Sequence, residues 1–90
     1  MSVLMANYRV RDFNWFKTVF DEFEPVRAEF GVTDHQVLRD PDDPSRVVVM
    51  IALPSADAAR RFSSEPRRAE ALVRAGVVAS FDTVLEQVES

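Results

Sequence analysis

Two segments of the chain are apolar without alternation, and they predict strands that are covered on both faces. The first runs from Val3 to Ala6 and the second from Val47 to Leu53. A strand with one solvated face alternates polar and apolar residues, whereas a strand buried on both faces reads as a continuous apolar run. The helices of this chain are enough to cover one face of a sheet, so we expect a second copy of the protein to cover the other.

A helical pattern follows the first strand, which we place at about residues 3–10. Asp12 fits the N-cap position and Gly31 the end of the helix. Pro25 interrupts the pattern, because it removes a backbone donor and disfavours a helical residue before it, and we expect a kink there. At ~100° per residue, eight apolar positions gather into an arc roughly 160° wide: Phe13, Trp15, Phe16, Val19, Phe20, Phe23, Val26 and Phe30.

The second half of the chain repeats this alternation of strand and helix. Residues 33–39 and the run from Arg46 predict two strands of a hairpin, joined by a turn rich in Asp and Pro. Ser55 fits the cap of a second helical region, which restarts near Pro66 and ends at Gly76. Its apolar face is weaker than the first: Ala56, Ala59, Phe62, Ala69, Leu72 and Val73.

The last predicted strand, about residues 79–88, alternates polar and apolar residues as an edge strand does. The order is therefore βαββαβ, which predicts one α+β domain over residues 1–90 with a ferredoxin-like, four-stranded antiparallel sheet. Right-handed crossovers place the first and third strands in the centre. One sheet face would then be a bare apolar patch larger than soluble monomers usually expose, and we expect a homodimer through this face.

Composition and charge remove several classes of function. The chain has 15 acidic and 11 basic residues, for a net charge of -4, which argues against a protein that binds nucleic acid by neutralising phosphates. It has no cysteine, so thiolate metal sites and cysteine nucleophiles are excluded, and we expect a cytoplasmic protein with no membrane segment. Neither a zinc-ligand spacing nor a glycine-rich phosphate loop occurs. We interpret the arginines at 60, 61, 67, 68 and 74 as a solvated face.

The residues at several motif positions carry a resemblance that spans nearly the whole chain. The chain resembles the small dimeric α/β-barrel proteins related to antibiotic biosynthesis monooxygenases, a family that includes many cyclase-like members. The positions that carry it are Asn7-Tyr8-Arg9-Val10-x-Asp12-Phe13-x-Trp15, Pro25-x-Arg27, His35-x-Val37-x-Arg39-x-x-Asp42-Asp43-Pro44 and Arg74-Ala75-Gly76-Val77.

This resemblance implies a dimeric α/β barrel with a cavity between sheet and helices that holds a small apolar or aromatic ligand. It also implies an enzyme without a cofactor, of monooxygenase or cyclase type, acting on an aromatic or polyketide-like substrate. The alternative is a non-catalytic, ligand-binding or regulatory dimer that uses the same cavity. No metal ligands are expected in either case.

Three polar residues are the candidates for the chemistry. Histidine is the side-chain type that changes charge near neutral pH, so His35 is the natural general base, with a structural role near the sheet edge as the alternative. Tyr8 and Asn7 follow the apolar part of the first strand and point to opposite faces, so one of the two can reach a given cavity. We place Tyr8 there on the resemblance, and Asn7, as the alternative, could hold a developing oxyanion.

Three further residues are candidates for contact with the substrate. Trp15 and Phe16 could wall the cavity and exclude water, with a purely structural core role as the alternative for Trp15. Arg27 falls inside the apolar arc on the helical wheel, where a guanidinium must be paired, stacked or aimed at an anionic ligand. The helical phase is open beyond Pro25, however, and we favour the interpretation of Arg27 as a surface residue whose stem covers apolar neighbours.

Overall fold

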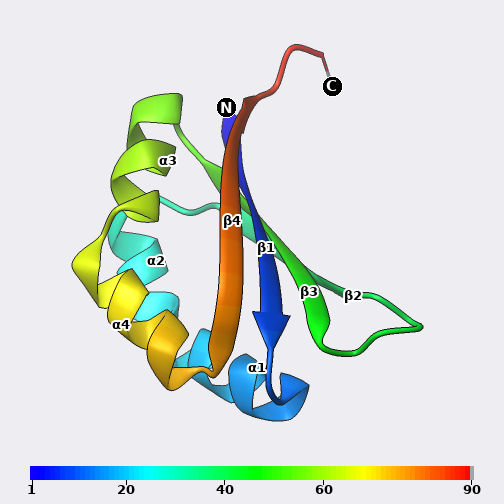
Figure 1. Cartoon of the computed structure of the whole chain (residues 1–90). Coiled ribbons are helices and arrows are strands. Elements are labelled where there is room, and N and C mark those ends of the chain that lie inside the picture. The colour runs from blue at the N-terminus through cyan, green and yellow to red at the C-terminus, as the bar shows by residue number, and fades with distance from the viewer. Residues whose placement is uncertain (90) are drawn as a thin grey trace.

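The computed structural model describes residues 1–89, which form an antiparallel sheet with helices over one face (Figure 1). The strand order is β2-β3-β1-β4, so the first and third strands lie in the centre, as the sequence predicts. The ferredoxin-like α+β fold is therefore confirmed. The elements in chain order are β1 Ser2–Val10, α1 Phe13–Glu22, α2 Glu24–Glu29, β2 Asp34–Arg39, β3 Arg46–Leu53, α3 Ala56–Ser63, α4 Pro66–Arg74 and β4 Val77–Glu86.

Capping side chains mark the starts of two helices, and a proline marks the break between α1 and α2. The carboxylate of Asp12 accepts the Trp15 backbone N–H at 2.9 Å, and the hydroxyl of Ser55 accepts that of Ala58 at 3.1 Å. Each bond satisfies an N–H that has no partner inside its helix. The predicted interruption at Pro25 separates α1 from α2. Each helical region is thus a pair of short helices, α1–α2 and α3–α4.

Strand alternation separates the side chains of the sheet into two layers. On β1, Leu4, Ala6, Tyr8 and Val10 are buried under the helices. The helix-facing residues of β3 pair with this layer and are also buried: Val47, Val49, Ile51 and Leu53. These residues form one core with Phe16, Val19 and Phe62 from the helices. The core therefore fills the space between the sheet and the two helix pairs.

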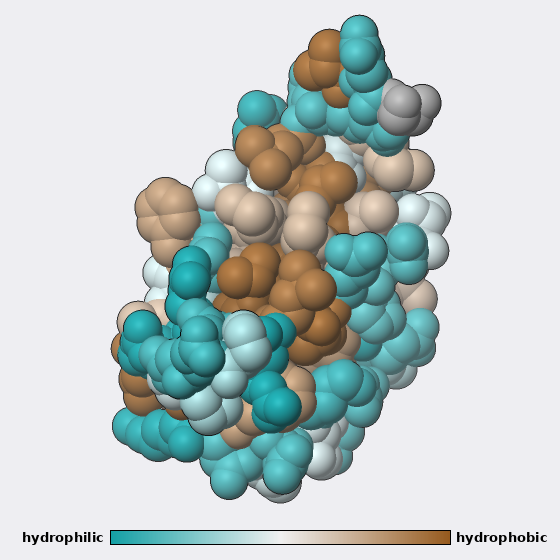
Figure 2. All heavy atoms as spheres, turned by 90° about the vertical axis from the view of Figure 1, so that its right-hand side faces the viewer, coloured by the Kyte–Doolittle hydropathy of each residue, from teal (hydrophilic) through white to brown (hydrophobic). Residues whose placement is uncertain are grey.

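The opposite face of the sheet is apolar and has no helix over it. Figure 2 looks onto this face and shows a hydrophobic band along its middle. We call it the bare face. Residues that alternate with the core layer compose it: Val3 and Met5 of β1, Leu38 of β2, Val48, Met50 and Ala52 of β3, and Phe81 and Leu85 of β4. Phe81 is 68% exposed, which is unusual for a phenylalanine on a sheet.

Two details of the second half differ from the sequence prediction. The last strand begins at Val77, two residues earlier than predicted, because Gly76 ends α4 with a φ of 78° and the chain enters the sheet at once. Ala69 and Val73, predicted on the apolar face, are exposed, Val73 by 77%. Ala71 is buried instead. The break between α3 and α4 resets the helical phase, so one wheel drawn through both helices places α4 wrongly.

The hairpin turn between β2 and β3 is closed by its own side chains. The carboxylate of Asp40 accepts the backbone N–H groups of Asp42 and Asp43, and Asp43 in turn binds Ser45 and Arg9. The acidic residues of the turn therefore stabilise a tight hairpin, as predicted. Within residues 1–89 no three acidic or histidine side chains are grouped as a metal site. No helix in that part of the chain has the length and apolar character needed to cross a membrane.

Candidate functional site

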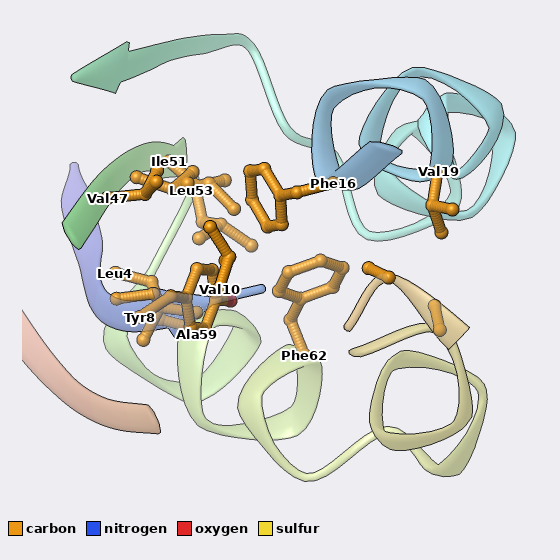
Figure 3. Packing of buried hydrophobic residues seen from close by; sticks show 14 of the residues in the cluster. Leu4, Tyr8, Val10, Phe16, Val19, Val47, Ile51, Leu53, Ala59 and Phe62 are labelled. Carbon is orange, nitrogen blue, oxygen red and sulfur yellow. The ribbon is translucent and has the colours of Figure 1, made fainter. Parts of the chain in front are cut away.

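A narrow cavity lies between the sheet and the two helix pairs, and we call it the inner cavity. It offers about 30 Å³ to a water-sized molecule; one water needs about 10–15 Å³ by the same measure, so the space is nearly filled. Figure 3 shows Phe16 and Phe62 projecting into this layer from the two helix pairs. The lining is mostly apolar: Tyr8, Phe16, Val19, Phe20, Phe23, Arg27, Ile51, Phe62, Arg68, Ala71, Leu72 and Ala75.

One polar cluster at the wall of the inner cavity joins β1, α4 and β4. The Arg68 guanidinium donates to the Tyr8 hydroxyl at 2.7 Å and to both carboxylate oxygens of Asp82, at 2.8 and 2.9 Å. Asp82 also accepts the Ser63 hydroxyl at 2.6 Å. Arg68 is 6% exposed and Tyr8 5%. This two-pronged contact with a carboxylate balances the buried charge of Arg68.

The geometry around Tyr8 sets what its hydroxyl can do. Its oxygen is occupied as an acceptor by Arg68. The phenolic proton binds no acceptor within residues 1–89, so it is free to donate into the cavity. Burial raises the pKa of Tyr8, while the positive charge of Arg68 acts in the opposite sense. Tyr8 therefore stays neutral, and its hydroxyl keeps a proton that it can donate.

Arg27 is buried, so its interpretation as a surface residue is wrong. It is 3% exposed, and its guanidinium carbon lies 3.9 Å from the centre of the Phe20 ring. The side chain donates to the Phe20 carbonyl at 2.7 Å, at the end of α1. Burial lowers the pKa of this guanidinium, while Glu24 and Asp21 act in the opposite sense. The alternative of a stacked arginine inside the apolar arc is the one that the structure supports.

His35 lies outside the inner cavity. It is exposed on β2, with its ring edge-on to Phe20 at 5.3 Å between centroids. It lines a surface hollow of about 280 Å³ together with Arg27 and Thr33, and Phe20 and Arg27 stand between this outer hollow and the inner cavity.

The sheet register also separates His35 from Tyr8. His35 pairs with Ile51 and Tyr8 with Val47, both on β3. Four residues along a strand span about 13 Å, so the two candidate catalytic groups do not meet at one atom.

The other three candidates lie in three different places. Phe16 is 1% exposed and lines the inner cavity. Asn7 is on the bare face, because it alternates with buried Ala6 and Tyr8. Trp15 is half exposed, and its indole N–H donates to the Arg74 carbonyl at 2.8 Å. The structure thus brings Tyr8, Phe16 and Arg27 together and leaves Asn7, Trp15 and His35 outside the inner cavity.

Two polar contacts join the helix pairs across the cavity. At one end Trp15 of α1 binds the end of α4, and at the other Arg67 of α4 binds Glu29 of α2 at 3.1 and 3.2 Å. Both contacts are at the surface, where hydrogen bonds and ion pairs contribute little to stability. An aromatic ligand needs more room than the inner cavity now has, so its uptake requires either the helix pairs or the lining side chains to move.

Arg68 and Asp82 were missed by the sequence analysis. Arg68 belongs to the arginines that the sequence predicts as a solvated face, and Asp82 lies in the predicted edge strand, where no functional role is predicted for it. The available signal was strand alternation, since Asp82 pairs with the buried Ala6 and so shares the helix side with it. A carboxylate on that side requires a cation opposite it.

The fold occurs in solved structures of known proteins. SnoaB, a cofactor-independent oxygenase from Streptomyces nogalater, superposes with a TM-score of 0.80 at 17% identity, over 99% of this chain and 94% of that one. A protein described as an antibiotic biosynthesis monooxygenase superposes with a TM-score of 0.72 at 13% identity, over 99% and 100%. Rv0793 from Mycobacterium tuberculosis gives 0.72 at 19% identity, over 99% and 96%.

These likenesses confirm, at the level of the fold, the resemblance found in the sequence. No protein-family model matches the chain, and no curated protein matches it. At identities below one residue in five, what is shared is the backbone architecture. The activity must be argued from the side chains of this chain.

Proposed function

We propose that the chain is a small-molecule enzyme of cofactor-independent monooxygenase or cyclase type, which binds an aromatic or polyketide-like substrate in the inner cavity. One observation carries the proposal: the Tyr8 hydroxyl, its oxygen held by Arg68, is left with a free proton at an aromatic-lined cavity. Such a donor stabilises an oxygen that gains negative charge during reaction. The fold shared with SnoaB, a cofactor-independent oxygenase, supports the same class.

The oxygenase form of the reaction balances without a cofactor. An activated CH2 group loses a proton, and the resulting carbanion transfers electrons to O2. Overall, CH2 and O2 give C=O and H2O, with one oxygen atom in each product. Tyr8 donates to the substrate oxygen over which the negative charge spreads, and Phe16 helps to exclude water. His35 acts as the base for a substrate that extends past Phe20 into the outer hollow.

Replacing Tyr8 with phenylalanine should lower kcat by about 10²–10³, because the change removes one donor to the developing oxyanion. The measurement is oxygen uptake with 1,8-dihydroxyanthrone as the probe, in the presence of EDTA and without added flavin. The wild-type protein should consume one O2 per anthrone and form the corresponding quinone. His35→Ala is measured in parallel, and its loss of rate should be greatest below the pH at which the substrate ionises by itself.

Oxygen uptake by the wild type and the two variants distinguishes the enzyme from the alternative, ligand-binding function. Unchanged uptake in Tyr8→Phe would remove Tyr8 from the mechanism, and unchanged uptake in His35→Ala would remove His35. If the anthrone binds in the cavity without uptake above the uncatalysed rate, the chain is a ligand-binding module. Such a module is favoured by the absence of any imidazole or carboxylate from the cavity lining.

We also propose that the working form is a homodimer that buries the bare face. Its central residues, Val48 and Met50 of β3 and Met5 of β1, line one surface hollow with Leu38. The charged residues Arg39, Asp40 and Arg46 line the same hollow. Covering this surface removes it from water at about 25 cal/mol per Å². A two-fold dimer would bring the same patch of each copy together.

Introducing a charge on the bare face should separate the dimer. Native mass spectrometry at micromolar concentration should show a dimer for the wild type and a monomer for Met50→Glu, because an unpaired carboxylate is costly inside an apolar interface. Val73→Glu is the control: Val73 is 77% exposed on α4, away from the bare face. A wild-type monomer would overturn the proposal, as would a dimer that only Val73→Glu disrupts.

A further inference from the structure

The inner cavity has a positive lining in a chain whose overall charge is negative. Two guanidinium groups, Arg27 and Arg68, are among its lining residues, and the lining contains no aspartate, glutamate or histidine. The whole chain carries a formal charge of -4. The positive sign at the cavity is therefore a local feature and not a consequence of composition.

The two guanidiniums differ in how their charge is balanced. Arg68 is held by both oxygens of Asp82. Arg27 forms no ion pair among the salt bridges of residues 1–89, which join Arg9, Lys17, Arg46, Arg61, Arg67 and Arg68 to their acidic partners. In direct contact, the Arg27 guanidinium has only a carbonyl dipole and an aromatic ring, and the charges of Glu24 and Asp21 stabilise it without forming an ion pair.

Those two contacts leave much of the binding capacity of Arg27 unused. A guanidinium has five N–H donors, and the Phe20 carbonyl accepts from one nitrogen. The flat group is fixed against the Phe20 ring, so its remaining donors are held in one plane without a further loss of side-chain entropy. This arrangement matches the two coplanar oxygens of a carboxylate.

We propose that the inner cavity takes an aromatic carboxylic acid in its ionised form, with Arg27 binding the carboxylate and the Phe side chains packing on the ring. This inference rests on the proposed function only in that the cavity binds an aromatic ligand. It adds the charge of that ligand and the residue that selects it. Tyr8, which lines the same cavity, is then available to a second oxygen of the ligand.

The test compares two probes of nearly equal shape, 2-naphthoate and 2-naphthamide, by isothermal titration calorimetry at pH 7. The wild type should bind the carboxylate about 10- to 100-fold more tightly than the amide, because hydrogen bonds between charged groups are stronger than neutral ones. Arg27→Gln should abolish this preference while the affinity for the amide changes little. Arg60→Gln is the matched control, since it removes the same charge from an exposed position on α3.

Each outcome supports or overturns a separate statement. Equal affinity for both probes in the wild type, or a preference that persists in Arg27→Gln, would overturn the role of Arg27 and leave ligand binding in the cavity standing. Failure of both probes to bind would overturn the proposed use of the cavity itself. Arg27→Lys covers the case in which Arg27→Gln does not fold, and it should keep the sign of the preference with a smaller ratio, because it keeps the charge without the planar fork.

Discussion

Replacing Arg68 with methionine should lower the free energy of unfolding by about 3 kcal/mol or more, as measured by urea denaturation. Methionine keeps most of the volume but leaves Asp82 without its cation and Tyr8 without its donor. Both groups are shielded from water, since the side chain of Asp82 is 21% exposed and Tyr8 is 5% exposed. A shielded carboxylate that loses its cationic partner keeps the free-energy cost of removal from water and has no ion pair to offset that cost.

The neighbouring residue provides the control for this variant. Arg67 also pairs with acidic groups, but its side chain is 47% exposed, and we expect Arg67→Met to cost at most about 1 kcal/mol. The double variant Arg68→Met/Asp82→Ala should recover part of the loss, because it removes the unpaired carboxylate as well. Equal costs for Arg67→Met and Arg68→Met would show that the Tyr8–Arg68–Asp82 cluster is not a stabilising element.

Replacing Phe62 with alanine should cost about 3–5 kcal/mol, a large part of the 5–15 kcal/mol that holds a typical domain folded. Phe62 is 1% exposed on α3, and its ring contacts Phe23 and Phe30 at 6.3 and 5.2 Å between centroids. It therefore connects the two helix pairs through the core (Figure 3). Thermal unfolding should be measured with Phe62→Ala made in the Met50→Glu variant. That variant is expected to be monomeric, so dimer dissociation does not contribute to the measured stability.

Phe81→Ala, made in the same background, removes the same number of atoms from a different place. Phe81 lies 68% exposed on the bare face, so its loss should change the stability of the monomer by less than about 0.5 kcal/mol. Similar costs for the two phenylalanines would contradict the assignment of the core to the helix side of the sheet.

The fold was predictable because its information is local and periodic. The unbroken apolar runs at Val3 and Val47 indicated central strands, and the arc that contains Phe16 and Phe20 indicated a helix on a sheet. Capping at Asp12 and the break at Pro25 depend on residues within one helical turn. Each of these signals can be found in a single sequence, because it depends on the spacing of nearby residues and not on which distant segment packs against them.

The polar part of the site was not predictable in the same way. Arg68 is buried because Tyr8 and Asp82 face it, and these partners are 60 and 14 residues distant in the chain. Arg27 was misplaced because Pro25 interrupts the helical phase two residues before it. His35 and Tyr8 share the helix side of the sheet, but only the strand register shows that they lie in separate hollows. The periodicity of a sequence predicts which residues share one face of a helix or strand. The composition of a site depends on which faces of distant elements pack together.

Trp15 gives the protein an optical reporter at the contact between its helix pairs. It is the only tryptophan in the chain, so its emission comes from one position. Its indole N–H is bonded to the Arg74 carbonyl across α1 and α4. If the pairs separate when a ligand enters, this bond exchanges for water and the emission spectrum shifts. If the ligand is accommodated by side-chain rearrangement alone, the spectrum stays in place, and the two routes can be told apart in unlabelled wild-type protein.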